Sequence, residues 1–171
     1  MKNNLIFIGM PASGKSTIGV VTAKRLGYQF IDTDLLIQEK EGKLLWEIIE
    51  EKGSDGFLKI EDEVNASVQV ERAVIAPGGS VVYCENAMKH FKNIGTVVYL
   101  HVPYTEIEAR IQNARSRGVV LKEGQTLRDL YKERCRLFEK YADIRINEDG
   151  LSMGETVARV LAVLGNIRGE S

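Results

Sequence analysis

Nine residues near the start of the chain, GMPASGKST, combine glycines, a lysine and hydroxyl side chains at a spacing that suits phosphate binding. Gly9, Gly14, Lys15 and Ser16 match the pattern G-x-x-x-x-G-K-[ST]. Glycines let successive backbone N–H groups surround phosphate oxygens, and the N-terminus of the following helix adds a positive potential. Lys15 would contribute a point charge, and Ser16 would offer its hydroxyl to Mg²⁺. The residues that we expect to bind a nucleotide here are Pro11, Ala12, Ser13, Gly14, Lys15, Ser16 and Thr17.

Two aspartates in the segment FIDTDLLIQ could complete a site for phosphoryl transfer. Asp32 and Asp34 follow a short apolar strand candidate, and open α/β sheets bind ligands at the carboxyl ends of their strands. One carboxylate there can hold a metal ion through water, and the other can accept a proton from an attacking hydroxyl. An Asx turn in which Asp34 caps the next helix is the structural alternative. Because a phosphate-binding pattern lies in the same chain, we favour the catalytic interpretation.

Glycines and arginines supply further candidates. Gly78 and Gly79 follow another strand candidate in VIAPGGSV, where bare backbone could approach a small ligand closely, although a plain turn would use the same residues. Arg117 lies in the segment 114–125, which we interpret as a mobile loop. An arginine there could close over a bound triphosphate and neutralise the charge on the transferring group. For the other arginines a solvated helix face is the alternative.

Strand and helix candidates alternate along the chain, which indicates a parallel sheet covered on both faces by helices. Apolar runs predict strands at 4–8, 29–31, 73–76, 96–101 and 143–146. Helical periodicity predicts helices at 15–26, 34–51, 55–71, 84–91, 104–115, 125–141 and 152–164. We expect residues of the helix N-caps at Thr105, Thr126 and Ser152.

Length and composition limit the classes of protein to consider. The 171 residues suit one α/β domain over 1–171 and leave no room for a second full domain. A net charge of −1 provides no basic field for nucleic acid or an anionic membrane surface, so we predict neither as a partner. Gly9 and Pro11 interrupt the first apolar run after four residues, which predicts a cytoplasmic protein without a signal peptide or membrane span. No long apolar surface stripe stands out, and we expect a monomer.

These residues resemble the shikimate kinases, a family with the P-loop fold of the nucleoside-monophosphate kinases. The resemblance covers nearly the whole chain and rests on GMPASGKSTIG, FIDTD, the glycine pair, Arg110 and Arg117 seven apart, and ERCRLFEKYAD. It implies a three-layer α/β/α fold with a five-stranded parallel sheet in the order 2-3-1-4-5. It also implies a mobile lid at about 114–125 and an acceptor-binding region at about 34–61.

The resemblance assigns a reaction and a nucleotide site. Shikimate kinases transfer the γ-phosphoryl group of ATP to the 3-hydroxyl of shikimate, a step in aromatic amino acid biosynthesis. By this likeness Lys15 binds the phosphates, while Ser16 and Asp32 bind Mg²⁺. Arg110 would lie against the adenine, and Arg117 would be the lid arginine that contacts the phosphates.

The acceptor site follows from the same resemblance. Asp34 would bind the hydroxyls of the acceptor and orient or deprotonate the one that reacts. Gly78 and Gly79 would line the acceptor pocket, and Arg134 would bind the carboxylate of the acceptor.

The chain departs from the family pattern mainly on the acceptor side. Where the family has F-R-x-x-E, the residues are FLKIE, and Leu58 replaces the arginine that pairs with the carboxylate of shikimate. Loss of such a bidentate partner weakens binding by about 1.5–3 kcal/mol if nothing replaces it. Ser80 replaces the third glycine of the family's G-G-G, and Gly118 replaces a proline of its lid, which should loosen the lid.

Three hypotheses follow. The leading one is an ATP-dependent small-molecule kinase that phosphorylates shikimate. The second keeps the chemistry and changes the acceptor to another small hydroxy acid or polyol that does not need the missing arginine. The third is a nucleotide-binding regulator with weak or no turnover. Leu58→Arg separates the first two by its effect on shikimate affinity, whereas tight ATP binding without any acceptor-dependent turnover would indicate the third.

Overall fold

The computed structural model describes residues 3–113, 119 and 121–168. The strands are β1 (Asn4–Ile8), β2 (Gln29–Asp32), β3 (Ala73–Ala76), β4 (Gly95–His101) and β5 (Ile144–Asn147). The helices are α1 (Lys15–Leu26), α2 (Thr33–Glu41), α3 (Leu45–Ala66), the short 3₁₀ helix η1 (Val81–Tyr83), α4 (Glu85–Ile94), α5 (Tyr104–Asn113), α6 (Leu127–Tyr141) and α7 (Met153–Arg168). Among the described residues no helix combines the length and apolarity needed to cross a bilayer.

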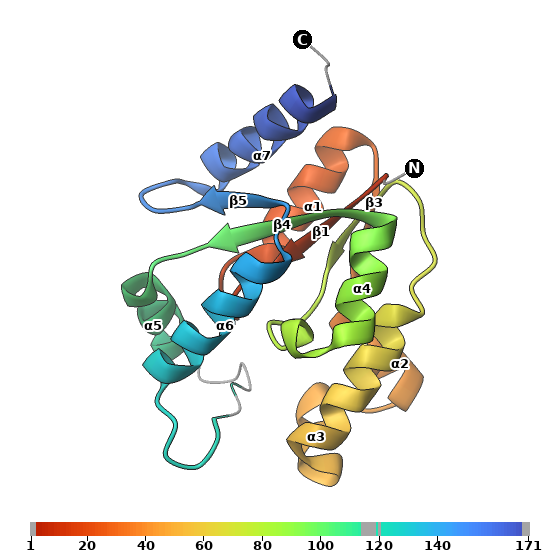
Figure 1. The fold of residues 1–171 in the computed structure, drawn as a ribbon, viewed down its shortest axis with the longest axis vertical. Helices are drawn as coiled ribbons and strands as arrows, with labels where there is room; N and C mark the ends of the chain where they lie inside the picture. Colours follow the sequence, from red (N-terminus) through yellow and green to blue (C-terminus); the bar gives the residue numbers. More distant parts are fainter. Residues whose placement is uncertain (1–2, 114–118, 120, 169–171) are drawn as a thin grey trace.

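The five strands form one parallel sheet in the order β2-β3-β1-β4-β5 (Figure 1). Strand β1 is central, because Leu5 pairs with Val74 of β3 on one side and with Thr96 of β4 on the other. Parallel neighbours need crossover connections, and the helices between the strands provide them. The predicted strand order and the predicted α/β/α architecture are therefore confirmed.

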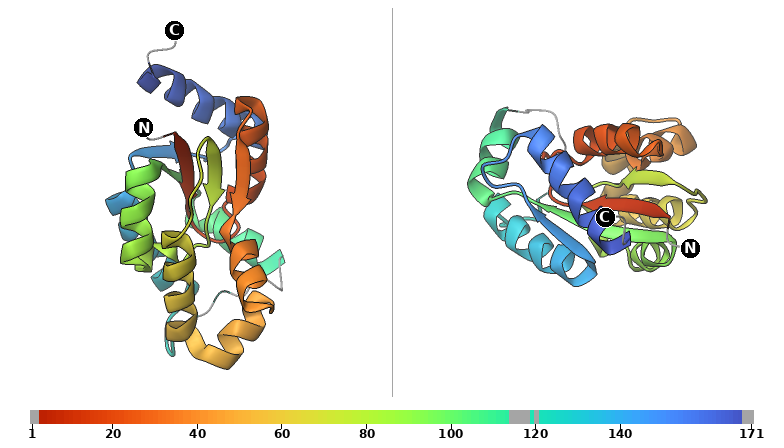
Figure 2. Two further views of the ribbon diagram at one scale, coloured as in Figure 1. Left: turned by 90° about the vertical axis from the view of Figure 1, so that its right-hand side faces the viewer. Right: turned by 90° about the horizontal axis from the view of Figure 1, so that it is seen from above.

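Helices cover both faces of the sheet (Figure 2). On one face α1 and α7 pack over a cluster that includes Leu5 and Phe7 of β1. On the other face α4 and α6 pack over a cluster that includes Ile6 and Ile8. Successive side chains of a strand point to opposite faces, so a central strand covered on both sides must be apolar at nearly every position.

Helices α2 and α3 extend beyond the carboxyl end of the sheet (Figures 1 and 2). They contact each other through a small apolar cluster of their own that includes Ile37, Ile48 and Phe57. The predicted acceptor-binding region at 34–61 falls on these two helices, next to the strand ends where the candidate site residues lie.

The prediction of one helix over 34–51 was wrong. Helix α2 ends at Glu41, where Gly42 adopts a left-handed conformation (φ 65°) and its N–H donates to the Gln38 carbonyl. Helix α3 then begins after Leu44, whose N–H donates to the Glu47 carboxylate at 2.7 Å. The predicted break near 52–54 is instead a kink inside α3 at Gly53, with φ 71° and ψ 176°.

Two of the three predicted helix caps are confirmed. Thr126 caps α6 and exchanges hydrogen bonds with Asp129, and Ser152 exchanges equivalent bonds with Glu155 at the start of α7. Thr105 is not the N-cap, since it is the second residue of α5. The Pro103 carbonyl accepts the first hydrogen bonds of that helix, which starts at Tyr104, as the predicted range 104–115 has it.

Candidate active site

The loop between β1 and α1 adopts the tight conformation that its glycines require. A Cβ atom at Gly9 would lie 2.8 Å from the Leu100 carbonyl oxygen, so that only glycine fits against β4. Gly14 has φ 88°, which is unfavourable for residues with a side chain. Ala12 is left-handed as well (φ 64°), and this strained position costs about 1 kcal/mol relative to glycine. The loop delivers the chain directly into the N-terminus of α1 at Lys15.

Lys15 is buried inside this loop. Its Nζ donates hydrogen bonds to the carbonyl oxygens of Gly9 at 2.9 Å and Met10 at 2.7 Å. Burial lowers its pKa to about 8, and the positive charge of Arg134 acts in the same direction, whereas Asp34 raises it. The loop therefore holds a cation beside the helix N-terminus, where phosphate oxygens bind in proteins of this kind.

Ser16 and Asp32 lie next to each other at the strand ends. The Ser16 hydroxyl donates to Asp32 Oδ2 at 3.2 Å, while Asp32 Oδ1 accepts the N–H of Asp34 at 3.0 Å. In the described residues, no three His, Cys, Asp or Glu side chains converge on one point. Mg²⁺ is usually held by one or two protein oxygens together with phosphates and water, so a hydroxyl and a carboxylate in contact fit that ion.

Asp34 faces the same site and does not cap the helix. Asp32 is the N-cap residue of α2, so the alternative in which Asp34 caps this helix was wrong. Burial raises the pKa of Asp34 to about 6, the charge of Asp32 raises it further, and Lys15 opposes both. A carboxyl group with a pKa near neutrality is a stronger base than a solvated aspartate, which suits it to take a proton.

Gly78 and Gly79 form the turn beside these carboxylates. A Cβ atom at Gly78 would lie 3.1 Å from Asp34 Oδ1, and one at Gly79 would lie 3.1 Å from Nη1 of Arg134. Arg134 is buried on α6, with its guanidinium 5.5 Å from the centre of the Tyr83 ring. The glycine pair therefore has an acidic group on one side and a basic group on the other.

Two arginines were predicted for the nucleotide site. Arg110 on α5 donates to the Ala12 carbonyl at 3.0 Å and forms an ion pair with Glu106, so its guanidinium lies beside the loop at 9–17, while its predicted contact with adenine stays a prediction. Arg117 and most of the predicted lid at 114–125 lie outside the described residues, and both predictions stay as they were.

Two buried carboxyl groups at the site were not predicted. Burial raises the pKa of Glu61 on α3 to about 7, although the Ser80 hydroxyl, which donates to it at 2.6 Å, opposes this shift. Burial also raises the pKa of Glu148 to about 7, against the charges of Arg110 and Lys15. The sequence carried a signal for Glu148, which directly follows β5 at the same edge of the sheet as Asp32.

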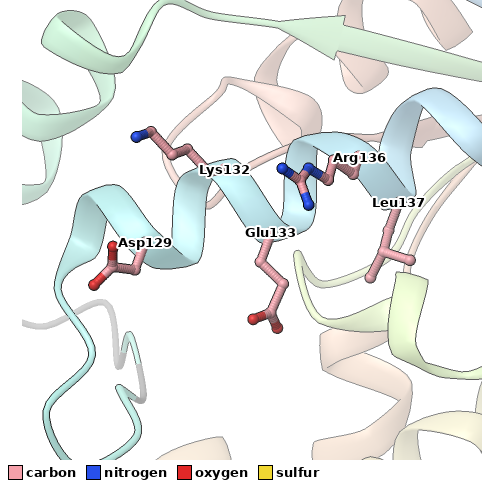
Figure 3. A pocket seen from close by; sticks show the side chains of 5 residues that line it. All are labelled: Asp129, Lys132, Glu133, Arg136 and Leu137. Atoms are coloured by element: carbon pink, nitrogen blue, oxygen red, sulfur yellow. The ribbon is translucent and has the colours of Figure 1, made fainter.

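A separate hollow of about 390 Å³ runs along α6 (Figure 3). Its lining residues are Asp129, Lys132, Glu133, Arg136 and Leu137. None of these is among the predicted site residues. We place the candidate active site at the carboxyl edge of the sheet because Lys15, Asp34 and Arg134 interact electrostatically there.

Comparisons with known proteins agree with this arrangement. The family model described as "Shikimate kinase" matches residues 11–165. The chain is 38% identical to a shikimate kinase of Clostridium botulinum over 168 residues, which cover 97% of this chain and 99% of the relative. It is 33% identical to a shikimate kinase of Sulfurihydrogenibium over 159 residues, which cover 92% and 95%.

A solved structure gives the same result for the fold. The shikimate kinase of Acinetobacter baumannii in complex with shikimate superimposes with a TM-score of 0.86 at 29% identity, covering 96% of this chain and 94% of that one. The family model, the two relatives and the solved structure each match nearly the full length of this chain. The chain belongs to the shikimate kinase family.

Proposed function

We propose that this protein is an ATP-dependent kinase that transfers the γ-phosphoryl group to a hydroxyl of a small carboxylic acid, with shikimate as the acceptor. One observation above all supports this. Lys15 and Asp34 act on each other's pKa at the carboxyl edge of the sheet, so a phosphate-binding cation and a candidate base face one site. Membership of the shikimate kinase family supports the identity of the acceptor.

The nucleotide binds along the loop at 9–17. Backbone N–H groups and Lys15 hold its β- and γ-phosphates, and they stabilise the charge on the γ-phosphoryl group during transfer. Ser16 and Asp32 hold Mg²⁺, which neutralises phosphate charge when bound. Arg110 lies against the adenine, a role supported by its contact with the loop at Ala12. Arg117 acts as the lid arginine, by the family resemblance alone.

The acceptor binds over Gly78 and Gly79, with its carboxylate at Arg134 and its reacting hydroxyl at Asp34. The hydroxyl oxygen forms a bond to the γ-phosphorus, the bond from that phosphorus to the bridging oxygen of ADP breaks, and the hydroxyl proton moves to Asp34. The proposed enzyme is a cytoplasmic monomer. The net charge of −1 supports the absence of a nucleic-acid or membrane partner.

The test is a coupled assay of ADP release with ATP, Mg²⁺ and shikimate. Lys15→Met and Asp34→Asn should each lower kcat/KM by at least about a hundredfold, because each removes a group that acts in the transition state. Lys24→Met is the matched control, since it makes the same change at an exposed position of α1. Full turnover by Lys15→Met would contradict the proposal. ATP binding by the unmodified protein without acceptor-dependent turnover would favour a regulator.

Leu58 favours a second candidate, which is a kinase of another small hydroxy acid or polyol. Its side chain packs against the apolar cluster under α4 and offers no positive charge to a carboxylate. Leu58→Arg should raise shikimate affinity if shikimate is the acceptor. An unchanged affinity for shikimate would favour a different acceptor.

A further inference from the structure

Glu61 is a fully buried carboxyl group with only one of its two oxygens engaged. Its Oε2 accepts the Ser80 hydroxyl at 2.6 Å and lies 4.0 Å from the sulfur of Cys84. Its Oε1 has no hydrogen-bond partner among the described residues. Such an orphaned oxygen costs about 1–3 kcal/mol in a folded protein, so that it needs an explanation.

The unengaged oxygen faces the acceptor side of the site. A Cβ atom at Gly78 would lie 2.9 Å from Glu61 Oε1 and 3.1 Å from Asp34 Oδ1. The two carboxyl groups, from α3 and α2, therefore border the same space beside the backbone of Gly78. A side chain at this position would force the Glu61 carboxyl group to shift, whereas glycine leaves it in place.

The two main departures from the family pattern meet at this carboxyl group. In F-R-x-x-E the arginine lies three residues before the glutamate, and side chains three apart on a helix are neighbours. Leu58 supplies no such donor here, and it packs against apolar side chains instead. Ser80 supplies a neutral donor, but only to Oε2. The substitutions thus leave Oε1 buried without a donor among the described residues, while Oε2 is held in place.

We infer that Glu61 binds the acceptor directly, through a hydrogen-bond donor on the carbon next to the reacting hydroxyl, and that Ser80 is the positioning residue that orients it. This inference rests on the proposed function. The acceptor is then a carboxylic acid with its carboxylate at Arg134, its reacting hydroxyl at Asp34 and a second donor at Glu61. A neighbouring hydroxyl or a protonated amine could supply that donor.

Two matched series of acceptors test the inference. In the first series, shikimate is compared with 4-deoxyshikimate and 4-amino-4-deoxyshikimate. In the second series, glycerate is compared with 3-hydroxypropanoate and serine. Within each series only the group next to the reacting hydroxyl changes, from hydroxyl to hydrogen to ammonium. ADP release gives kcat/KM for each compound with the unmodified protein, Glu61→Gln, Ser80→Ala and the control Glu63→Gln on the exposed side of α3.

For whichever series is turned over, a donor-bearing compound should exceed its donor-free partner by at least about tenfold in kcat/KM. Glu61→Gln and Ser80→Ala should reduce that ratio to about threefold or less, whereas Glu63→Gln should leave it unchanged and the KM for ATP should stay constant in all variants. Comparing kcat/KM of the hydroxyl compound with that of the ammonium compound then shows which donor Glu61 binds. A merely structural role of Glu61 would lower activity without changing the ratio.

Two results would overturn the inference, and they are distinguishable. Turnover with an unchanged donor ratio in both variants would leave the proposed kinase function intact and remove Glu61 from acceptor binding. Absence of turnover with every compound would contradict the proposed function and the inference together. Ser80→Ala keeps the test open if Glu61→Gln does not fold, because it leaves the carboxyl group in place.

Discussion

Two buried carboxyl groups make the stability of this protein depend on pH. Glu61 is 0% exposed and Glu148 is 5% exposed, and burial raises the pKa of each to about 7 from an ordinary value of 4.5. Both therefore bind more protons in the folded state than in the unfolded chain between those pH values. Their contribution to the free energy of unfolding is fully present below pH 4.5 and is lost as the pH rises through about 7.

Glu61→Gln should remove this dependence at one of the two positions. The free energy of unfolding of the variant, minus that of the unmodified protein, should be about 1–3 kcal/mol larger at pH 8 than at pH 5, because glutamine has no charge to bury. Urea denaturation at both pH values measures the change. Glu63→Gln, on the exposed face of the same helix, should show no such gain. An equal difference at pH 5 and pH 8 for Glu61→Gln would contradict the raised pKa.

The residues of the site differ in how far the sequence predicts them. Lys15 and Asp34 follow from patterns, because a phosphate loop needs glycine and lysine at fixed spacing and its acidic partners lie at a strand end. Glu61 is marked only as the last residue of the family pattern F-R-x-x-E, which says nothing of its environment. Its burial and its contact with Ser80 depend on the packing of α3 against the segment after β3, which the local sequence does not encode.

Among the elements, β1 is anchored by one buried polar side chain. The amide nitrogen of Asn4 donates to the carbonyl oxygens of Val70 at 2.9 Å and Ile94 at 3.0 Å, and its amide oxygen accepts the N–H of Ala73 at 3.0 Å. These three bonds join the start of β1 to the first residue of β3 and to the residues just before β3 and β4. Asn4 thus fixes where the two neighbouring strands begin relative to β1.

Asn4→Leu should destabilise the fold by about 2–4 kcal/mol, because it keeps the size of the side chain and leaves buried backbone groups without partners. Asn86→Leu is the matched control, since Asn86 is exposed and its hydrogen bond to Asp62 is on the surface. It should change the free energy of unfolding by less than about 1 kcal/mol. Urea denaturation compares the two variants, and equal losses would remove Asn4 from this role.

Helices α2 and α3 show where hydrophobic periodicity gives a wrong prediction. The apolar spacing of α2 continues into α3, so periodicity alone predicts one helix over 34–51. The break depends on the left-handed conformation of Gly42 and on the Glu47 carboxylate that accepts the N–H of Leu44. Such local hydrogen bonds compete with helix continuation without changing hydrophobic periodicity.

For the whole molecule, the strand order makes the sheet depend on contacts between distant parts of the chain. In the part of the chain that the structure describes, β1 pairs only with β3 and β4, and β2 pairs only with β3. A fragment that ends at Arg72 contains β1 and β2 without any strand that pairs with them. It should show no protected amides in β1 and no cooperative unfolding, as measured by hydrogen exchange and circular dichroism. Protected amides at 5–8 in that fragment would contradict the strand pairing.

The same strand order determines when the protein can become active during its synthesis. The loop that we propose binds phosphate is made among the first residues, yet the strand that precedes it has both of its neighbours only after His101. At roughly 5–20 residues per second, a ribosome needs about 5–20 s to add those residues. Until Ala76 is made the apolar segment LIFI has no neighbouring strand, and until His101 is made its other edge stays unpaired, so the nascent chain exposes it to molecular chaperones and to other unfolded chains. A slower translation rate between 9 and 101 would lengthen that exposure without changing the finished enzyme.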